Sequence, residues 1–440
     1  MRRPGRPRPP STRTALLWIL ALALALRLGC LLLAPLPAHE GLTRYDDNRY
    51  DALAWSIATG KGYRDSLGRL EIKDPPVLPI LTAGLYRLLG HDRTPVYIFQ
   101  ALLSTATVAL VFGLARRLFG DVAALLAAAL TAVNLDLIVF SSILLTETAF
   151  VFLLCAAMLA WERALEAPTN ARWALTGALL GLAALARPAA QLLIVGVAGA
   201  TVVGWHSRGR PRRLVGVLLV AVAAFALTLA PWTIRNYLAF HRFVPVATGA
   251  GIGFWVGTNV AWRGLDLDLR TGSSIYADAD FQRAAAGDPV AADRRMLGEA
   301  AGHVVRDPLG VLRLAPGKLL QMLRPGAWLG LHFPAGDPGR RPFVVLLALQ
   351  YYPVLVLASL GSALLALRSR AARPALLRAW TPIAYVGLLT LATIPARRYM
   401  LPAVPFLAVL AGMALQRLGH IARRWRPLPQ RARGTIEVPS

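Results

Sequence analysis

The segment TRYDDNRYD, residues 43–51, gathers three carboxylates in a chain whose formal net charge is +25. Asp46 and Asp47 are adjacent, and apolar side chains recur after them at helical spacing as far as Gly60. Carboxylates at a helix start can simply bind free backbone amides, which contributes about 0.5–2 kcal/mol. The alternative is general-base chemistry, in which a carboxylate removes a proton from a hydroxyl group. The doubled acid, the nearby Arg49 and the position just after a long apolar run favour base chemistry.

Another acid and a pair of arginines have similar potential. Glu147, in the sequence LLTETAF, lies at the end of an apolar run, either as a first-turn acid of a helix or as a functional group beside apolar surface. Arg397 and Arg398 are adjacent at the end of a later run, with Tyr399 beside them. A guanidinium fork suits phosphate oxygens, although arginines at such a boundary also anchor helices to lipid headgroups.

The composition indicates which elements must position these residues. Apolar residues make up 56% of the 440-residue chain, and its mean hydropathy is +0.51. This leaves too little polar surface for soluble domains, and a run such as residues 15–34 is long enough to cross a hydrocarbon core of about 30 Å. The arginines cluster at the ends of apolar runs, which is typical of topology signals and lipid-phosphate contacts and not of a nucleic-acid surface. We therefore predict an all-α, polytopic integral membrane protein.

The apolar runs predict the spans and their orientation. They fall near residues 15–36, 96–114, 121–140, 144–161, 173–186, 189–205, 214–231, 343–367, 379–395 and 399–418. Arginines concentrate in alternate short loops, which places both termini in the cytoplasm and leaves long outer loops at 37–95 and 232–341. We expect about 10–13 transmembrane helices, the larger number if residues 76–90 or 308–331 enter the bilayer. Amphipathic interfacial helices are expected in the first outer loop and at 308–323, and a soluble helix at 288–306.

The ends of the chain and its cysteines add little chemistry. Residues 1–14 and 421–440 are expected to be basic cytoplasmic ends of one membrane domain, 15–420. The first apolar run has no AxA-type cleavage site, so we interpret it as an uncleaved span. Both cysteines lie in apolar runs and the seven histidines are scattered, so no disulfide, metal site or cofactor is predicted.

The order of several motifs carries a resemblance that no single motif would. These are DDNRYDALA (46–54), GKGY (60–63), PPVLPILTAGLY (75–86), SSILLTETAF (141–150), ARP (186–188), PWTIRNYLAFHRFVPVATGAGIGFWVGTN (231–259) and PARRYMLPAVPF (395–406). Together they cover nearly the whole chain. The pattern resembles the GT-C superfamily of polyprenyl-phosphate-sugar-dependent glycosyltransferases, especially bacterial members of the dolichyl-phosphate-mannose protein mannosyltransferase family and the aminoarabinose transferases that modify lipid A.

The resemblance implies an inverting glycosyltransferase that moves a sugar from a polyprenyl-phosphate donor to an extracytoplasmic acceptor, which is a protein, a lipid or an envelope glycan. Asp46 matches the family's first-loop acid, the base or the group that orients the acceptor, and Asp47 matches the second acid. Glu147 matches an acid of a second outer loop, and Arg49 an arginine near the lipid phosphate. The expected location is a bacterial inner (plasma) membrane, with the active site outside and membrane lipid as a partner.

The remaining candidates are weaker. Aminoarabinose transferases carry a lysine directly before the Pro-Pro pair, whereas this chain has Asp74 there and Lys73 one position earlier. That shift weakens Lys73 as a donor-phosphate ligand and argues against aminoarabinose as the sugar. Possible contacts to the sugar or acceptor form a further group, in which interfacial aromatic residues are common for other reasons: Tyr50, Arg235, Asn236, Trp255 and Asn259.

Two other classes of function stay open. A transporter or a flippase for lipid-linked sugars would place charges within the spans and repeat its two halves, and only Arg27 is charged in mid-span. A catalytically inactive relative that binds lipid would carry much the same motifs. Replacing Asp46 with Asn and measuring sugar transfer separates an enzyme from such a relative.

Overall fold

The computed structural model describes residues 11–33, 42–205, 211–265, 274–324, 339–395 and 397–424. Within these ranges the regular structure is helical, apart from one isolated antiparallel bridge between Arg64 and Leu70. The all-α prediction is confirmed.

The described residues of the first half of the chain form ten α-helices. They are α1 (Thr12–Leu33), α2 (Leu42–Ala58), α3 (Val77–Leu89), α4 (Thr94–Phe119), α5 (Asp121–Ala132), α6 (Leu135–Phe140), α7 (Glu147–Glu166), α8 (Asn170–Ala186), α9 (Leu193–Trp205) and α10 (Pro211–Phe240), with the 3-10 helix η1 (Pro188–Ala190) before α9. The described residues of the second half add α11 (Ala250–Thr258), α12 (Ala279–Ala285), α13 (Pro289–Arg306), α14 (Pro308–Arg313), α15 (Ala315–Leu323), α16 (Arg340–Arg368), α17 (Arg373–Ala392) and α18 (Val404–Arg424), with 3-10 helices η3 (Ile275–Ala277), η5 (Arg370–Ala372) and η6 (Arg397–Ala403).

Eight helices in the described part of the chain are long and apolar enough to cross a membrane. They correspond to eight of the ten expected runs. The run at 121–140 breaks into α5 and α6 because Asn134 caps α6, its side chain accepting a hydrogen bond from the Leu137 amide. The run at 173–186 becomes α8, which has 17 residues and is slightly shorter than a full span.

The spans pack closely where their residues are small. α18 lies against α5, and a side chain at Gly412 would place its Cβ only 2.5 Å from the Ala123 carbonyl oxygen. α8 lies equally close to α10, since a Cβ at Gly177 would overlap the carbonyl of Ala221. Small residues let helix backbones approach in a bilayer, where dispersion and not the hydrophobic effect drives association. These contacts hold α5 against α18 and α8 against α10.

Two buried cations hold the helices together. Arg27, the mid-span charge of α1, donates from Nε to the Ser104 hydroxyl at 2.7 Å and from Nη1 to the carbonyls of Ala23 and Ala132. Lys318 of α15 donates to the Leu391 and Thr393 carbonyls near the end of α17, at 2.6 and 2.9 Å. Each satisfies backbone carbonyls that would otherwise be buried without a partner. Both residues therefore have structural roles.

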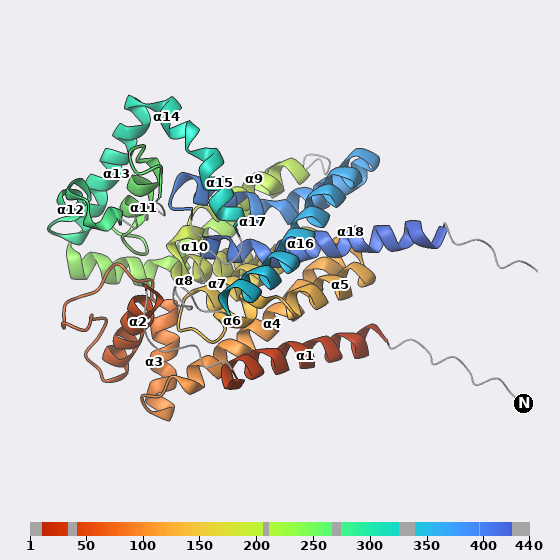
Figure 1. The fold of residues 1–440 in the computed structure, drawn as a ribbon, viewed down its shortest axis with the longest axis horizontal. Helices are drawn as coiled ribbons and strands as arrows, with labels where there is room; N and C mark the ends of the chain where they lie inside the picture. The colour runs from red at the N-terminus through yellow and green to blue at the C-terminus, as the bar shows by residue number, and fades with distance from the viewer. Residues whose placement is uncertain are drawn as a thin grey trace, which may run out of the picture.

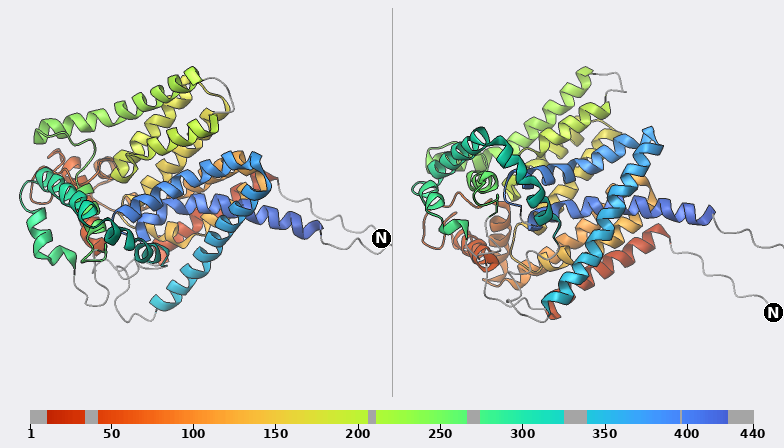
Figure 2. Two further views of the ribbon diagram at one scale, coloured as in Figure 1. Left: turned by 90° about the horizontal axis from the view of Figure 1, so that it is seen from above. Right: turned by 45° about the horizontal axis from the view of Figure 1, so that its top comes forward.

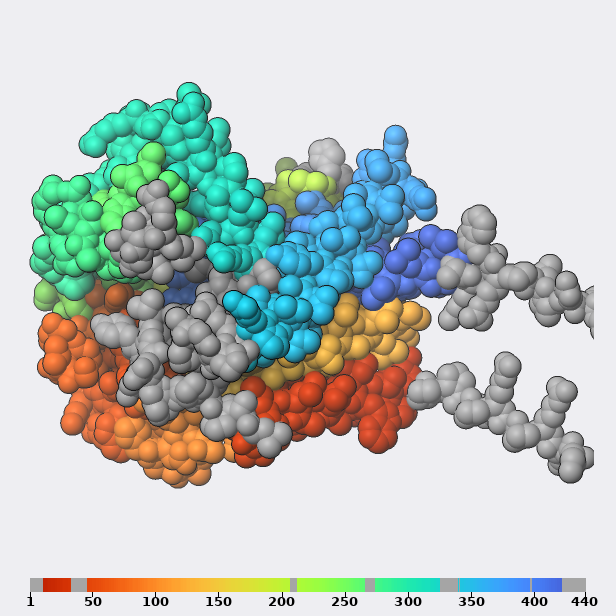
Figure 3. Space-filling view, in the orientation of Figure 1, coloured from red at the N-terminus to blue at the C-terminus, as the bar shows by residue number. Residues whose placement is uncertain are grey.

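The described parts of the two loops that we expect on the outer side, 37–95 and 232–341, meet at one end of the molecule; they are called the first and second outer loops below. Figures 1 and 2 show α2 and α3 at the same end as α11–α15, whereas α1 starts and α18 ends at the opposite end. The space-filling view shows the orange first-loop segment next to the green and teal second-loop segment (Figure 3). The soluble helix expected at 288–306 is α13, and the expected helix at 308–323 is divided into α14 and α15. This arrangement is the one that an active site built from both outer loops requires.

Candidate active site

Asp46 and Asp47 lie in the second turn of α2 and not at its start. α2 begins at Leu42, and its first turn contains no acidic residue. The prediction that the helix starts at these aspartates is therefore wrong. The free amides of a helix belong to its first turn, so capping does not account for either carboxylate. Both side chains are 20% exposed, which leaves them accessible to a substrate.

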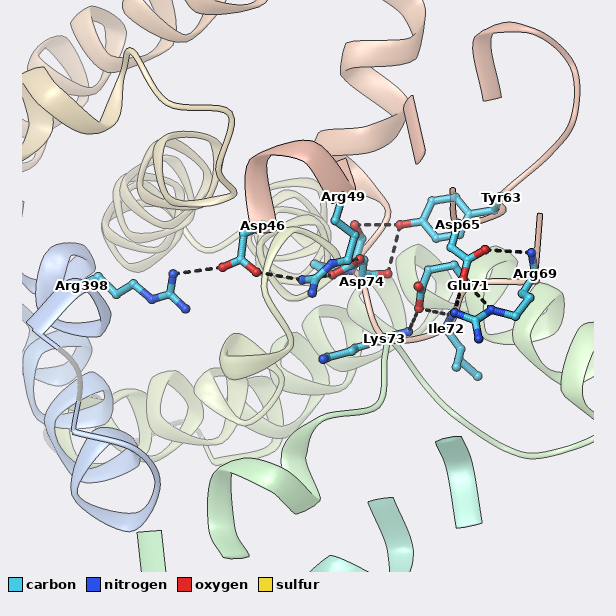
Figure 4. Close-up of polar contacts among 11 residues, drawn as sticks. Asp46, Arg49, Tyr63, Asp65, Arg69, Glu71, Ile72, Lys73, Asp74 and Arg398 are labelled. Carbon is cyan, nitrogen blue, oxygen red and sulfur yellow. Dashed lines mark hydrogen bonds and ion pairs between the residues drawn. The ribbon is translucent and has the colours of Figure 1, made fainter. Parts of the chain in front are cut away.

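Asp46 joins two arginines that come from distant parts of the chain (Figure 4). Its Oδ2 accepts a hydrogen bond of 3.1 Å from Nη1 of Arg398, which belongs to η6. Its Oδ1 lies 3.3 Å from Nη2 of Arg49, one turn further along α2. The expected catalytic acid and an expected phosphate-binding arginine are thus in direct contact, although the sequence separates them by 352 positions.

Arg49 is also the partner of Asp74, the residue directly before the Pro-Pro pair. Nη2 of Arg49 donates to Oδ1 at 2.8 Å, and Nε lies within ion-pair distance of Oδ2, at 2.6 Å. The Tyr63 hydroxyl donates to the Asp74 carbonyl at 3.0 Å. Burial raises the pKa of Asp74 to about 6, although Arg49 acts in the opposite direction. Asp74 therefore attaches the segment that contains Pro75 and Pro76 to α2 through its buried contact with Arg49.

Asp47 points toward a different cation. Its Oδ2 lies 3.9 Å from Nη1 of Arg93, which also donates to Asp51 at 2.8 Å and to the Asn48 side chain at 3.1 Å. Burial raises the pKa of Asp47 to about 6, while Arg93 and the Leu144 amide lower it. A carboxylate with such a pKa is suited to take a proton near neutral pH.

Glu147 is the first residue of α7 and is only 3% exposed. Its Oε1 lies 2.9 Å from Nη1 of Arg187, the residue between α8 and η1. The Arg187 guanidinium also lies over the Tyr399 ring, 4.9 Å from its centre, and that of Arg398 lies 5.2 Å from the same centre. Arg187 was not among the predicted site residues, although its motif ARP contributed to the resemblance. Its pairing with Glu147 gave no sequence signal, because the two residues lie on different helices.

Arg397 and Tyr50 are two further predicted site residues close to this cluster. The side chain of Arg397 lies outside the described residues, so its role stays a prediction. Tyr50 is 8% exposed and packs in the core, with the Arg49 guanidinium 5.6 Å from its ring centre. Its ring therefore supports Arg49 from within α2.

A cavity of about 730 Å³ lies beside the first-loop network, between the 61–73 loop and the second-loop helices. It is lined by Asn48, Arg49, Asp65, Ser66, Leu67, Arg69, Leu70, Glu71, Ile72, Lys73, Phe240, Thr248, Gly249, Ile252, Ala285, Gly287, Pro289, Ala292, Asp293 and Met296. Arg49 is the residue shared by the cavity and the Asp46 network. The Lys73 ammonium group has no hydrogen-bond or ion-pair partner among the described residues, and Figure 4 shows it extending away from Glu71. Lys73 is therefore an exposed lysine at the wall of this cavity.

Arg235 and Asn236 fasten the outer loops to the end of α10. Arg235 donates from Nη1 to the Glu71 carbonyl at 2.8 Å and from Nη2 to the Tyr63 carbonyl at 3.2 Å. Asn236 is fully buried, and its amide donates to the carbonyls of Val244 and Val246, at 3.0 Å each. Both side chains hold backbone in place, and Asn236 is out of reach of a ligand in this conformation.

Trp255 and Asn259 belong to the helical unit of the second outer loop. Trp255 is 2% exposed and donates from Nε1 to Glu299 of α13 at 2.7 Å. Asn259 accepts a hydrogen bond of 3.2 Å from the Trp262 amide. Neither residue lines the cavity. In the described part of the chain, no group of three or more His, Cys, Asp or Glu side chains is placed to hold a metal ion.

The comparisons with known proteins agree with this fold. Residues 73–234 match the family model of dolichyl-phosphate-mannose-protein mannosyltransferases. Archaeal oligosaccharyltransferase AglB from Archaeoglobus fulgidus, in complex with an inhibitory peptide and a dolichol-phosphate, is similar over 95% of this chain and 52% of its own, with a TM-score of 0.56 and 14% identity. The resemblance to the dolichyl-phosphate-mannose-protein mannosyltransferases is confirmed over these matched residues. The matched family is one of glycosyltransferases.

Two further solved structures are similar to this chain. The oligosaccharyltransferase of Archaeoglobus fulgidus in complex with Zn and sulfate is similar over 93% of this chain and 50% of its own, with a TM-score of 0.55 and 15% identity. ArnT from Cupriavidus metallidurans, bound to undecaprenyl phosphate, aligns over 94% of this chain and 78% of its own, with a TM-score of 0.44 and 15% identity. This chain spans about half the length of the archaeal enzymes it matches. The comparison with curated proteins gave no match.

Proposed function

We propose that this protein is an inverting glycosyltransferase that moves a sugar from a polyprenyl-phosphate donor to an acceptor hydroxyl outside the cytoplasm. The contact between Asp46 and Arg398 carries the proposal. Transfer from a lipid phosphate needs a base on one side of the anomeric carbon and cations for the departing phosphate on the other. Asp46 with Arg398 and Arg49 supplies both kinds of group within one hydrogen-bonded network.

The proposed reaction is a single displacement. A carboxylate takes the proton of the acceptor hydroxyl, whose oxygen forms a bond to the anomeric carbon as the bond from that carbon to the phosphate oxygen breaks. The bonding electrons leave with the phosphate, which Arg398 and Arg49 stabilise. Attack opposite the leaving group inverts the anomeric centre, as in an inverting glycosidase with an alcohol in place of water.

The two aspartates have different proposed roles. Asp46 is held between two guanidinium groups and is the group that orients the acceptor hydroxyl or takes its proton. Asp47 has a pKa raised to about 6 by burial, so it is the better proton acceptor of the second-turn pair near neutral pH. Arg398 has five N–H donors, of which its contacts to Asp46 and to the Tyr399 hydroxyl use two, so it can hold the phosphate while it contacts Asp46.

The proposed orientation has both termini in the cytoplasm and the site at the outer surface of a bacterial inner membrane. The N-terminal end of α1 and the C-terminal end of α18 lie at the end of the molecule opposite α2 and α11–α15. This supports placing the termini on one side of the membrane and the site on the other. The AglB structure was solved with a dolichol-phosphate, a lipid phosphate of the proposed donor class. Its identity of 14% supports the fold only, so the lipid remains part of the proposal.

The test is transfer by the purified protein in lipid nanodiscs, with polyprenyl-phosphate sugars as donors and envelope extracts as acceptor source. We expect release of polyprenyl phosphate and labelled acceptor from the wild type, and a loss of at least about 100-fold in Asp46→Asn. Asp280→Asn is the control, since Asp280 is an exposed acid in α12. Equal rates in Asp46→Asn and wild type would exclude Asp46, and donor movement across the bilayer without transfer would favour a flippase.

A further inference from the structure

Glu147 is a buried carboxylate with two arginines near it. It is 3% exposed, and its direct partner is Arg187 at 2.9 Å. Arg398 lies close enough for its charge to interact with that of Glu147 as well. An ionised carboxylate in such a place requires compensation, because an unpaired buried charge is far more costly than a paired one. Two cations are thus available to one anion.

The direct pairing with Arg187 has a consequence for Arg398. Because Arg187 satisfies Glu147, the Arg398 guanidinium is directed to Asp46 at 3.1 Å and to the Tyr399 hydroxyl at 3.4 Å. We propose that Arg187 is a positioning residue that occupies Glu147 and so keeps Arg398 available for the donor phosphate. This inference rests on the proposed function, and it adds a residue and a mechanism that the resemblance does not supply.

The Tyr399 ring contacts the guanidinium groups of both arginines. Both guanidinium groups lie beside its ring, at 4.9 Å for Arg187 and 5.2 Å for Arg398. Contacts between a cation and an aromatic ring are favourable, and most so where water is excluded. The ring therefore holds the two arginines next to each other without neutralising either of them, which a third carboxylate would do.

The proposal predicts an order of phosphate affinities among variants, and simple loss of a structural contact would not produce that order. In Arg187→Gln the cation left near the buried Glu147, among the side chains that the structure describes, is Arg398, so Arg398 turns to it and loses the phosphate. In the double variant Arg187→Gln with Glu147→Gln that competing charge is gone, and Arg398 is free again. Arg187→Lys keeps the positive charge beside Glu147, so Arg398 stays available. Glu147→Gln alone removes the competitor and leaves phosphate binding no weaker than in the wild type.

The opposite end of α7 offers a matched control. Glu162 is 4% exposed and pairs with Arg378 of α17 at 2.6 Å, so it is also a buried Glu–Arg pair of the same helix. It lies far along α7 from Glu147 and has no link to Asp46. Arg378→Gln and its double variant with Glu162→Gln report the general effect of breaking and then removing such a pair. They are expected to change stability without changing phosphate binding.

The experiment measures the dissociation constant of a short-chain polyprenyl phosphate, with the matching polyprenol as comparison, in nanodiscs. We expect Arg187→Gln to bind the phosphate about tenfold or more weakly, as loss of a charge-assisted hydrogen bond implies. Arg187→Lys, Glu147→Gln and the double variant should stay within a few-fold of the wild type, and polyprenol binding should not change. Thermal unfolding of each variant identifies any that fails to fold, and Glu147→Gln and Arg187→Lys then keep the test decisive.

Three outcomes would overturn the inference: wild-type binding in Arg187→Gln, a double variant as weak as the single one, or a large loss in Glu147→Gln. If the wild type does not prefer polyprenyl phosphate to polyprenol at all, the proposed function itself fails. The wild-type measurement therefore separates failure of the function from failure of the positioning role.

Discussion

Asp46 and Arg398 are 352 positions apart in the sequence and are joined by an ion pair of 3.1 Å. The contact links the first outer loop to the segment before the last span, so the site is complete only when the whole bundle has formed. It also pairs an acid with the cation proposed for the leaving phosphate. The proposed phosphate therefore binds beside this pair, which makes Arg398 a direct test of the mechanism.

Arg398→Gln should lower kcat/KM for the lipid-phosphate donor by about 100-fold or more, because it removes a charge that stabilises the leaving group. Arg398→Lys should recover only part of this loss, since an ammonium group cannot form the two parallel hydrogen bonds of a guanidinium. Initial rates at varied donor concentration measure the effect. An exposed arginine, Arg283 of α12, gives the control variant Arg283→Gln. Equal rates in Arg398→Gln and the control would remove Arg398 from the donor site.

The sequence predicted the elements of this site better than their contacts. Long apolar runs and basic loop ends are local signals, and eight of the runs are helices of full spanning length. The N-cap Asn134, which divides the run at 121–140, was also a local signal that a closer analysis of caps would have found. The start of α2 at Leu42 was missed because the residues before Asp46 lack an apolar repeat.

Pair contacts between distant segments have no local signal. Asp46, Arg49 and Arg398 were each predicted, but Asp74 was noted only as a departure from the related transferases. The structure explains that departure, since Asp74 is the buried ion-pair partner of Arg49. Arg187 was visible as part of a motif, yet its role depends on Glu147 and Tyr399, which reach it only through helix packing.

The pH dependence of transfer should follow Asp47. Its pKa is raised to about 6 by burial, so the carboxylate becomes a base as the pH rises through that value. We expect the transfer rate to increase from pH 5 to pH 7. Asp47→Asn should lower the rate reached at pH 7 and remove this pH-dependent step. Asp74 has a pKa of about 6 for the same reason, so Asp74→Asn must be measured beside it. A step that survives in Asp47→Asn and disappears in Asp74→Asn would transfer the assignment to Asp74.

The same shift has a consequence for stability. A carboxyl group with a folded-state pKa above its usual value of about 4 favours the fold when protonated. The contribution is present at low pH and is lost as the pH rises toward 6. Asp47→Asn should therefore gain thermal stability relative to the wild type as the pH rises from about 4 to about 6, and keep that gain at higher pH. No change in that difference with pH would mean that Asp47 is not desolvated as the structure indicates.

The buried pair of Arg49 and Asp74 should matter for folding as well as for chemistry. Asp74 is 2% exposed, and removing one partner of such a pair costs about 3–5 kcal/mol of unfolding free energy. Asp74→Ala removes the acceptor of the Arg49 hydrogen bond altogether, and it should lose that much in equilibrium unfolding in mixed micelles. The exposed pair of Asp280 and Arg283 is the control, and Asp280→Ala should cost no more than about 1 kcal/mol. Equal effects of the two variants would show that the Arg49 pair is solvated.

Asn236 separates a structural role from a contact to substrate. It is fully buried, and its amide donates to two backbone carbonyls between α10 and α11. Asn236→Ala should cost about 2–3 kcal/mol of unfolding free energy, since two buried acceptors lose their donors. The KM for the acceptor in the protein that remains folded should not change.

Asn259 is the matched comparison, because it is only half-buried and its oxygen accepts a single hydrogen bond from the Trp262 amide. Asn259→Ala should cost less than Asn236→Ala in stability, about 1 kcal/mol. If Asn259 contacts the sugar or the acceptor, its variant should raise the KM while the fold is retained. The opposite result would be a raised acceptor KM in Asn236→Ala with unchanged stability. Because the Asn236 amide is fully buried, that result would require the end of α10 to move when substrate binds.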